Sequence, residues 1–225
     1  MRWFFLTVLA FLIAYLLVGS VFHHLLFSEP KVQETYFPRS GDTIVNAEQG
    51  QRMVLRQTAH ETDGELVQVE VFLKPGGGPD AHVHLGQDAK LTVRAGELTV
   101  LMNDEEHRLG VGDTLVVPAG KSHKPTNQGT RDARVVLEMR PAGNYDQFLV
   151  QYHGFMTEEG AVRSDKDVFW QMVLFGPRYH TFAGNTPVVL QRAVSFLLAP
   201  TARFLGYQSF YPEYTVGARK TGKAG

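Results

Sequence analysis

The chain has 225 residues, of which 44% are hydrophobic and 20% charged, and its net charge of -1 at neutral pH is almost balanced. This composition is typical of a globular protein with one ordinary domain and short appendages. The basic residues form no dominant stripe, which argues against a nucleic-acid-binding protein. There is no cysteine, so disulfide-stapled scaffolds and thiolate zinc sites are excluded.

The first element in the chain is an uncharged apolar run from Trp3 to Phe22. A helix of this length can cross the hydrocarbon core of a bilayer. We therefore expect residues 1–27 to form a single-pass transmembrane anchor. A cleaved signal peptide and a helix buried within the protein are the alternatives. Arg2 and the α-amino group precede the run, which favours a cytoplasmic N-terminus with the rest of the chain on the non-cytoplasmic side.

Residues 28–40 contain two prolines and little periodicity, and they are predicted to form a linker. Residues 41–143 have a different character, because short, β-branched and partly alternating segments recur between turn residues. These segments are residues 52–59, 65–73, 89–95, 97–102, 114–120 and 133–139. No helical stretch separates them, so the chain is predicted to be mainly β, with a compact antiparallel barrel or sandwich.

Residues 144–225 are predicted to form a helical extension. Asn144 is a candidate N-cap for a first helix, whose apolar spacing continues through Met156 and which is expected to end by Gly160. Asp167 is a candidate N-cap for a second helix, which the Gly176-Pro177 pair is expected to stop.

A third helix is predicted to start at Thr186-Pro187 and to be kinked or ended by Pro200. Its expected place is against the β domain, and a position in the membrane interface is the alternative. The basic end of the chain, residues 218–225, is expected to be a solvated tail.

His82 and His84 are two residues apart on a predicted strand, so their side chains should project to the same face. His123 follows a turn at residues 118–120 that re-aims the chain, and it is a candidate third ligand. Three neutral imidazoles that converge inside the β domain would suit a divalent transition metal, namely iron, manganese, nickel, copper or zinc. The structural alternative is that His123 donates to Asn127 or to a turn carbonyl and only stabilises the turn.

At these residues the sequence resembles the cupin family. Its second motif, G-x5-P-x-G-x2-H-x3-N, is matched at every position by Gly112, Pro118, Gly120, His123 and Asn127. Its first motif, G-x5-H-x-H followed by a glutamate and a glycine, is matched by Gly76, His82, His84 and Gly96, but the glutamate is missing. The resemblance covers about residues 52–140. It implies an antiparallel double-stranded β-helix, the jelly-roll barrel of cupins, and a metal held by three histidines and that carboxylate. Within the family, the chain is similar to single-barrel members with H-x-H-x-x-Q and a helical C-terminal tail.

The place of the missing glutamate falls at Asp88 or Ala89. Strand alternation puts Ala89 towards the interior and Asp88 on the opposite face, so Asp88 is a poor substitute. Gln87 has the inward parity, and its amide oxygen is a neutral and weaker ligand. The predicted metal site is therefore His82, His84, His123 and either Gln87 or water, and it should be more labile than the family norm.

Two classes of function are open at this point. The first is a metal-dependent oxidoreductase, a dioxygenase-like enzyme acting on a small and largely apolar substrate, because the predicted inward residues are apolar and no second clear acid or base is visible. The second is a non-catalytic module that binds a small molecule inside the barrel, or an interaction partner of another membrane protein through residues 3–22 and the aromatic segment 204–214. The expected partners are thus the membrane and a small molecule, and the resemblance implies that two copies of the chain pair as a homodimer.

Overall fold

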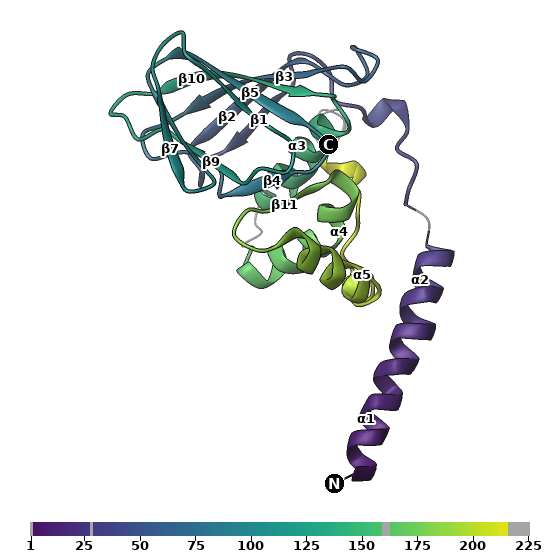
Figure 1. Ribbon diagram of the computed structural model, residues 1–225. Coiled ribbons are helices and arrows are strands. Elements are labelled where there is room, and N and C mark those ends of the chain that lie inside the picture. The colour runs from purple at the N-terminus through teal and green to yellow at the C-terminus, as the bar shows by residue number, and fades with distance from the viewer. Residues whose placement is uncertain (1, 28, 159–162, 216–225) are drawn as a thin grey trace.

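The computed structural model describes residues 2–27, 29–158 and 163–215 of the chain (Figure 1). Gly160 and the basic segment 218–225, for which the sequence predicts a helix end and a solvated tail, lie outside the described residues. The strands form one part of the molecule, the C-terminal helices lie against it, and the N-terminal end of the first helix extends away from both (Figure 1).

Two antiparallel sheets make up the β domain. The larger sheet contains, in spatial order, β1 (Thr43–Asn46), β2 (Gln51–Gln57), β3 (Val67–Leu73), β10 (Ala133–Arg140), β5 (Asp88–Ala95) and β8 (Thr114–Val117). The smaller sheet contains β11 (Thr181–Ala183), β4 (His82–His84), β9 (His123–Thr126), β6 (Leu98–Met102) and β7 (Glu105–Leu109). The prediction of an antiparallel, mainly β fold with a helical C-terminal part is confirmed, whereas closure of the sheets into a jelly-roll barrel stays a prediction of the resemblance.

Strand alternation places the core as the sequence predicts. In β5, Ala89, Leu91 and Val93 are buried, and Asp88 and Lys90 are exposed. These apolar side chains share one hydrophobic core with residues of the smaller sheet and of the first C-terminal helix. The inward face of β5 therefore belongs to a common interior between the sheets and the helical part.

Four strands were not predicted, namely β1, β7, β9 and β11, and all of them except β9 lie at a sheet edge. β9 has four residues and lies between β4 and β6. β7 has the sequence Glu-Glu-His-Arg-Leu and is half-buried at most, so it carries no apolar alternation for a pattern to detect. β1 has only four residues. β11 follows a helix in the C-terminal part and pairs with β4, so a segment far along the chain extends the sheet that carries His82 and His84. The C-terminal extension is therefore not purely helical.

The helix α3 (Tyr145–Met156) begins after Asn144, as predicted, but Asn144 does not cap it. Its side-chain amide instead donates to the carbonyl of Arg178, at 3.0 Å. Asn144 thus ties the start of α3 to the end of the following helix.

The helix α4 (Asp165–Tyr179) corrects two further predictions. Its N-cap is Ser164, and Asp167 is the third residue of a reciprocal capping box with it. The helix continues through Gly176-Pro177 and ends before His180, which adopts a left-handed conformation at φ +53°. Glycine at 176 allows close packing, because a Cβ there would lie 2.9 Å from the Phe182 ring.

The helix α5 (Val188–Phe204) follows Pro187, which occupies the N-cap position, and it passes through Pro200 without ending there. It packs chiefly on α4, where Ala199 and Ala202 join a small apolar cluster with Val173 and Leu174. The predicted packing of α5 on the β domain is therefore mostly indirect, through α4.

The N-terminal residues form one continuous helix built from α1 (Arg2–Ala14), a π-helical segment (Tyr15–Ser20) and α2 (Val21–Leu26). By length and composition it is able to cross a membrane, and a signal sequence would pass the same test. The described part of the predicted linker contains a 3-10 turn, Glu34–Tyr36. Glu29 at its start forms ion pairs with Arg178 of α4 and Arg203 of α5, which fixes the linker to the helical part.

Candidate metal centre

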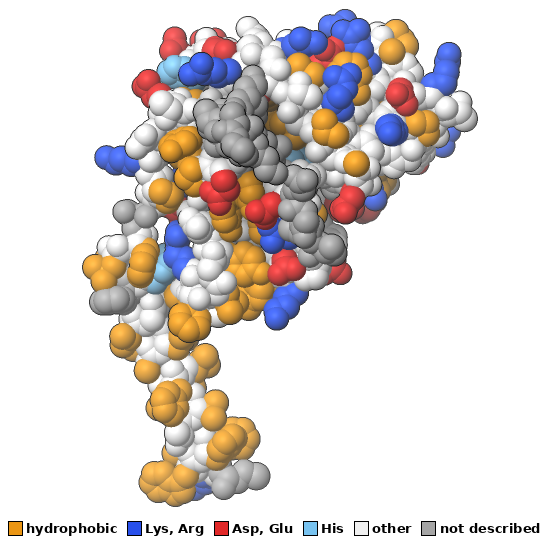
Figure 2. Space-filling model, turned by 180° about the vertical axis from the view of Figure 1, so that it is seen from behind, with side chains coloured by type: hydrophobic (Ala, Val, Ile, Leu, Met, Phe, Trp, Pro, Cys, Tyr) orange, Lys and Arg blue, Asp and Glu red, His pale blue; other side chains and the backbone are white. Residues whose placement is uncertain are grey.

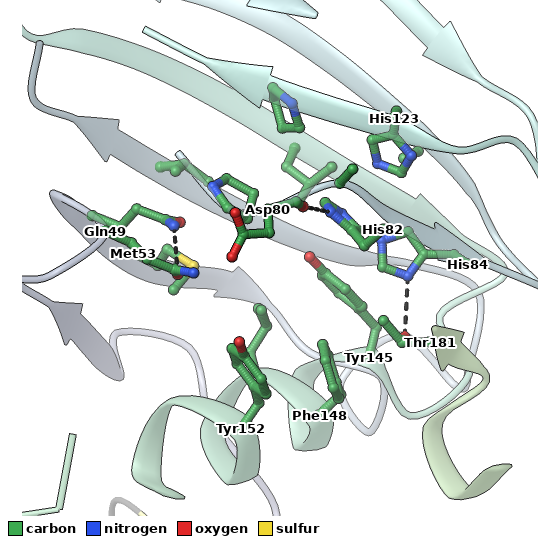
Figure 3. Close-up of a pocket in the computed structure, with 18 of the residues that line it drawn as sticks. Gln49, Met53, Asp80, His82, His84, His123, Tyr145, Phe148, Tyr152 and Thr181 are labelled. Carbon is green, nitrogen blue, oxygen red and sulfur yellow. Dashed lines mark hydrogen bonds between the residues drawn. The ribbon is translucent and has the colours of Figure 1, made fainter. Parts of the chain in front are cut away.

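The three histidines predicted as ligands converge from two neighbouring strands. His82 in β4 lies opposite His123 in β9, and His84 projects from the same face of β4. One ring nitrogen from each lies within 4.8 Å of those of the other two. Figure 3 shows the three rings facing one another at the edge of a cavity.

Backbone oxygens fix the tautomers of two of these rings. The Nδ1 atom of His82 lies 2.7 Å from the carbonyl oxygen of Asp80, and that of His123 lies 3.1 Å from the carbonyl oxygen of Lys121. A carbonyl oxygen can only accept, so both rings carry their hydrogen on Nδ1. The Nε2 atoms of His82 and His123 then hold free lone pairs.

A hydroxyl relay fixes the third ring in the same way. The Nδ1 atom of His84 lies 3.2 Å from Oγ1 of Thr181, and that hydroxyl donates its hydrogen to the carbonyl of Tyr179, also at 3.2 Å. Since the threonine hydrogen is already used, Nδ1 of His84 donates to Thr181. All three histidines therefore present Nε2 lone pairs, the arrangement in which outer partners orient metal-binding imidazoles.

Burial keeps the three imidazoles neutral. It lowers the pKa of His82, and it lowers the pKa of His123 to about 3, with a further contribution from the nearby His82 ring. Burial lowers the pKa of His84 well below its ordinary value, and the neighbouring rings of His82 and His123 lower it further. Neutral, oriented imidazoles are what a transition metal requires, so this donor set fits a divalent metal ion.

The predicted fourth ligand, Gln87, is buried but does not line the cavity beside the histidines. Its amide nitrogen donates to the carbonyl of Ala142 at 3.3 Å, whereas its Oε1 atom is buried without a hydrogen-bond partner among the described residues. An unpartnered buried amide oxygen retains a free lone pair, which is a requirement for a ligand. Coordination by Gln87 stays a prediction.

Asp88 and Ala89 lie as strand alternation predicts. Asp88 is exposed, and its carboxylate accepts a hydrogen bond from the backbone N–H of Ala119 at 2.8 Å, which holds the turn before His123. Ala89 is buried and lines the cavity. The position that faces the interior thus holds a methyl group. In the part of the chain that the structure describes, the histidine cluster contains no carboxylate.

Asn127 of the second motif and Gly78, which precedes β4, hold the local backbone. Asn127 is fully buried, its amide donates to the carbonyls of Leu73 and Arg131, and its oxygen accepts from the N–H of Gly129. It is a turn-stabilising residue. Gly78 has φ +152°, and a Cβ there would lie 2.3 Å from the carbonyl oxygen of Pro125. Glycine therefore lets the segment leading to β4 pass directly over β9.

The histidines border a cavity of about 260 Å³ with largely apolar walls. Its walls come from both sheets and from α3 and α4 of the C-terminal part. The apolar lining includes Met53, Leu91, Leu137, Phe148 and Met172. A cavity of this size and lining suits a small, mostly apolar molecule.

Polar groups enter the cavity at two places that the sequence did not reveal. Figure 3 shows the hydroxyl of Tyr145, the first residue of α3, pointing into the space between Asp80 and the histidines. The Tyr145 ring meets the His84 ring edge-to-face, with centroids 5.2 Å apart. Burial raises the pKa of the Tyr145 phenol, so it remains protonated and can donate a hydrogen bond. Tyr152 and His153, further along α3, also line the cavity.

The segment that carries the histidine motifs matches a known protein family. The family model described as the cupin domain matches residues 69–138. Residues 69–138 form a cupin domain. This segment of the chain contains all three histidines, whereas Tyr145 and Thr181 come from residues beyond it.

One curated relative is the tetracenomycin polyketide synthase protein TcmJ of Streptomyces glaucescens. It is 38% identical over 80 residues, which are 36% of this chain and 52% of the relative. The chain therefore spans about half the length of that curated relative.

Two solved structures each match about half of the chain. KdgF from Halomonas sp. is 23% identical with a TM-score of 0.38, over 45% of this chain and 94% of that chain. A predicted oxalate decarboxylase from Thermotoga maritima is 17% identical with a TM-score of 0.41, over 50% of this chain and 99% of that chain.

Proposed function

We propose that this protein is a membrane-anchored cupin that binds a divalent transition metal through His82, His84 and His123 and admits a small, largely apolar molecule to the adjacent cavity. The observation that carries the proposal is the common orientation of the three rings. Each Nδ1 atom donates to an oxygen, which leaves the Nε2 lone pairs free, and one ring nitrogen of each histidine lies within 4.8 Å of those of the other two.

The chemistry of the site favours a metal-dependent oxidoreductase. A bound iron, manganese, nickel, copper or zinc ion would supply Lewis acidity, and the redox-active ions among them would supply one-electron chemistry. The apolar walls would hold the substrate and exclude water, and the Tyr145 hydroxyl would donate a hydrogen bond to an oxygen atom of the substrate. The relative TcmJ is named a polyketide synthase protein, and this name supports a role as an enzyme or as part of an enzyme system.

Gln87 or water is the proposed fourth ligand. The unpartnered Oε1 atom supports Gln87. Its absence from the cavity wall supports water instead. Either ligand is neutral, so the metal should be held less tightly than by three histidines and a carboxylate.

A non-catalytic binding module is the second candidate function, and the lack of a carboxylate in the described histidine cluster favours it. In that case the cavity would hold its ligand without turnover. Oxygen consumption in the presence of metal and a panel of small apolar substrates separates the two functions, because only the oxidoreductase would consume oxygen faster with substrate than without it.

The helix formed by residues 2–26 is the proposed single-pass anchor, with its N-terminus in the cytoplasm and the cupin domain on the other side. Pairing of two copies, and contact with another membrane protein, are further proposals that the family resemblance and the apolar N-terminal helix suggest.

Metal titration of the full chain tests the central proposal. The detergent-solubilised protein is stripped with a chelator and titrated with each ion by calorimetry. We expect one ion per chain for the wild type and no binding for His123→Ala, since two ligands hold a labile ion poorly. His60→Ala removes an exposed histidine outside the site and serves as the matched control. Equal binding by the wild type and His123→Ala would contradict the proposal.

A further inference from the structure

Polar contacts hold the C-terminal half of the N-terminal helix against α5. The hydroxyl of Tyr15 donates to the carbonyl of Leu197 at 2.6 Å and lies 3.0 Å from Oγ1 of Thr201. The hydroxyl of Ser20, which is fully buried, donates to the carbonyl of Phe196 at 3.1 Å. These contacts determine which turns of the N-terminal helix lie beside α5.

A third contact extends the same interface. The ring of His24 stacks on that of Phe196 with centroids 4.3 Å apart, and its Nε2 atom lies 3.0 Å from the Phe196 carbonyl oxygen. The region of the N-terminal helix from Tyr15 to His24 therefore lies beside α5, whereas α1 has no buried residue.

The interface between the N-terminal helix and α5 determines how deep α5 lies in a bilayer that the N-terminal helix spans. A hydrocarbon core of about 30 Å takes about 20 helical residues, which the apolar run from Trp3 to Phe22 supplies. Tyr15 then lies about 10 Å inside the core from the Phe22 end, at 1.5 Å per residue. Because α5 is hydrogen-bonded to Tyr15 and Ser20, part of α5 must lie at the depth of the outer leaflet.

The exposed face of α5 has the composition that this depth requires. Val189, Leu190, Phe196, Leu197 and Phe204 recur at helical spacing on one side of α5, and we call them the α5 stripe. They are all exposed, with Val189 81% and Phe204 90% exposed. The middle of the stripe borders the N-terminal helix, because Phe196 stacks on His24. The opposite side of the helix, with Ser195, Ala199 and Ala202, is buried against the rest of the protein.

The charges around the α5 stripe also fit a membrane surface. Arg192 is exposed at the flank of the stripe, where its side chain can extend to lipid headgroups. Figure 2 shows hydrophobic side chains gathered where the N-terminal helix joins the rest of the molecule. The apolar surface of the N-terminal helix thus meets that of α5 where Tyr15 contacts Leu197.

We propose that α5 is embedded in the interface of the same bilayer that the N-terminal helix spans, with the α5 stripe facing the lipid. The protein is then held by two elements, one that crosses the membrane and one that lies in its outer leaflet. This inference rests on the proposed membrane span, because α5 takes its depth from its contacts with that helix.

The lack of cysteine allows a direct test on the full chain. Single-cysteine variants carry one environment-sensitive fluorophore each, and the protein is reconstituted into phosphatidylcholine vesicles. Val189→Cys and Phe204→Cys report on the α5 stripe, and Phe11→Cys reports on the free part of α1. Val111→Cys is the matched control, since Val111 is an exposed apolar residue of the β domain at 68% exposure. All four sites are exposed, so folding should be preserved.

Quenching by lipids brominated on the acyl chain is compared with quenching by aqueous iodide. We expect lipid quenching at positions 11, 189 and 204 to be at least about twofold stronger than at 111, and iodide to quench only 111 efficiently. If positions 189 and 204 follow 111 while 11 is quenched by lipid, the inference is overturned and the span stands. If 189 and 204 are shielded from both quenchers, a protein covers the α5 stripe and the inference is likewise overturned. If position 11 is not quenched by lipid, the membrane span itself fails, and this inference fails with it.

Discussion

At the scale of single residues, the site depends on where each imidazole hydrogen lies. His82 and His123 donate from Nδ1 to backbone carbonyls that the fold fixes, and His84 donates to Thr181, which is itself committed to Tyr179. This arrangement leaves three Nε2 lone pairs and no competing proton. Thr181 is the only one of these partners that acts through its side chain, so it is a positioning residue for His84.

Replacing Ala89 by glutamate should strengthen metal binding. Ala89 is buried and lines the cavity, and a carboxylate there restores the anionic ligand whose place it occupies. We expect the dissociation constant of the metal to fall by about tenfold or more, as measured by calorimetry. Ala89→Gln is the matched neutral control. The same affinity in both variants would show that position 89 does not reach the metal.

Replacing Tyr145 by phenylalanine should weaken ligand binding or turnover without affecting the metal. The variant keeps the ring that packs on His84 and removes only the hydroxyl that points into the cavity. Loss of one donor to an uncharged oxygen costs about 0.5–1.5 kcal/mol, or roughly a factor of 2 to 10 in affinity. Metal content by elemental analysis should equal that of the wild type. A fall in metal content would make Tyr145 part of the metal site instead.

The site could be predicted from the sequence as far as local spacing reaches. His82 and His84 share a face because they are two residues apart on a strand, and the turn before His123 follows from the motif. Tyr145 and Thr181 could not be predicted in this way. Thr181 lies 97 residues from His84, and only the pairing of β11 with β4 brings the two together. That pairing depends on how the helices pack, which no local pattern encodes.

At the scale of elements, patterns predicted most of the buried strands and missed three of the four edge strands, β1, β7 and β11, together with the short internal strand β9. β5 alternates clearly because one side faces the core, whereas β7 is mostly solvated and carries charge instead. Proline and glycine were poor guides to helix ends. Gly176 and Pro200 lie inside α4 and α5, where packing against neighbouring residues outweighs their low helix propensity.

Removal of the cap of α4 should destabilise the protein. Ser164→Ala removes the hydroxyl that caps the Asp167 N–H, while the backbone bond to the Asp167 carboxylate remains, and it should cost about 1 kcal/mol, or about 2–4 °C in the midpoint of thermal unfolding. Lys166→Ala, an exposed change in the same turn, is the control. Equal midpoints for Ser164→Ala and the wild type would show that the cap contributes nothing.

The capping box should also make stability depend on pH. Hydrogen bonds from the Ser164 side chain and backbone, and from Tyr207, lower the pKa of Asp167 to about 2. A carboxyl whose pKa is lower in the folded state stabilises the protein above its unfolded pKa, about 4, and this stabilisation is lost as the pH falls to about 2. In urea unfolding, the wild type should therefore lose more stability than Asp167→Asn between pH 5 and pH 2. Parallel pH profiles would contradict this assignment.

At the scale of the whole molecule, the cavity joins the parts of the chain. The cupin domain supplies the histidines, α3 and α4 supply the end wall, and β11 adds the strand that orients His84. The C-terminal part is thus a component of the site. If α5 is embedded in the bilayer, the same part also sets the position of the cavity relative to the membrane.

Metal should stabilise the whole molecule, because its ligands come from two strands that otherwise meet only through one residue pair in their ladder. An ion at 100 times its dissociation constant stabilises the folded state by about 2.7 kcal/mol. We expect the midpoint of thermal unfolding to rise on addition of metal for the wild type and for His60→Ala. For His82→Ala, we expect no rise. A rise in that variant would place the bound metal elsewhere.

The most direct test of the metal centre is elemental analysis of the full chain, purified in detergent without a histidine tag or chelator, by inductively coupled plasma mass spectrometry. The convergence of His82, His84 and His123 predicts close to one iron, manganese, nickel, copper or zinc ion per chain, and its loss in the His82→Ala/His123→Ala double variant. A wild-type protein without metal that also refuses added metal, or a double variant that retains a full equivalent, would contradict the account.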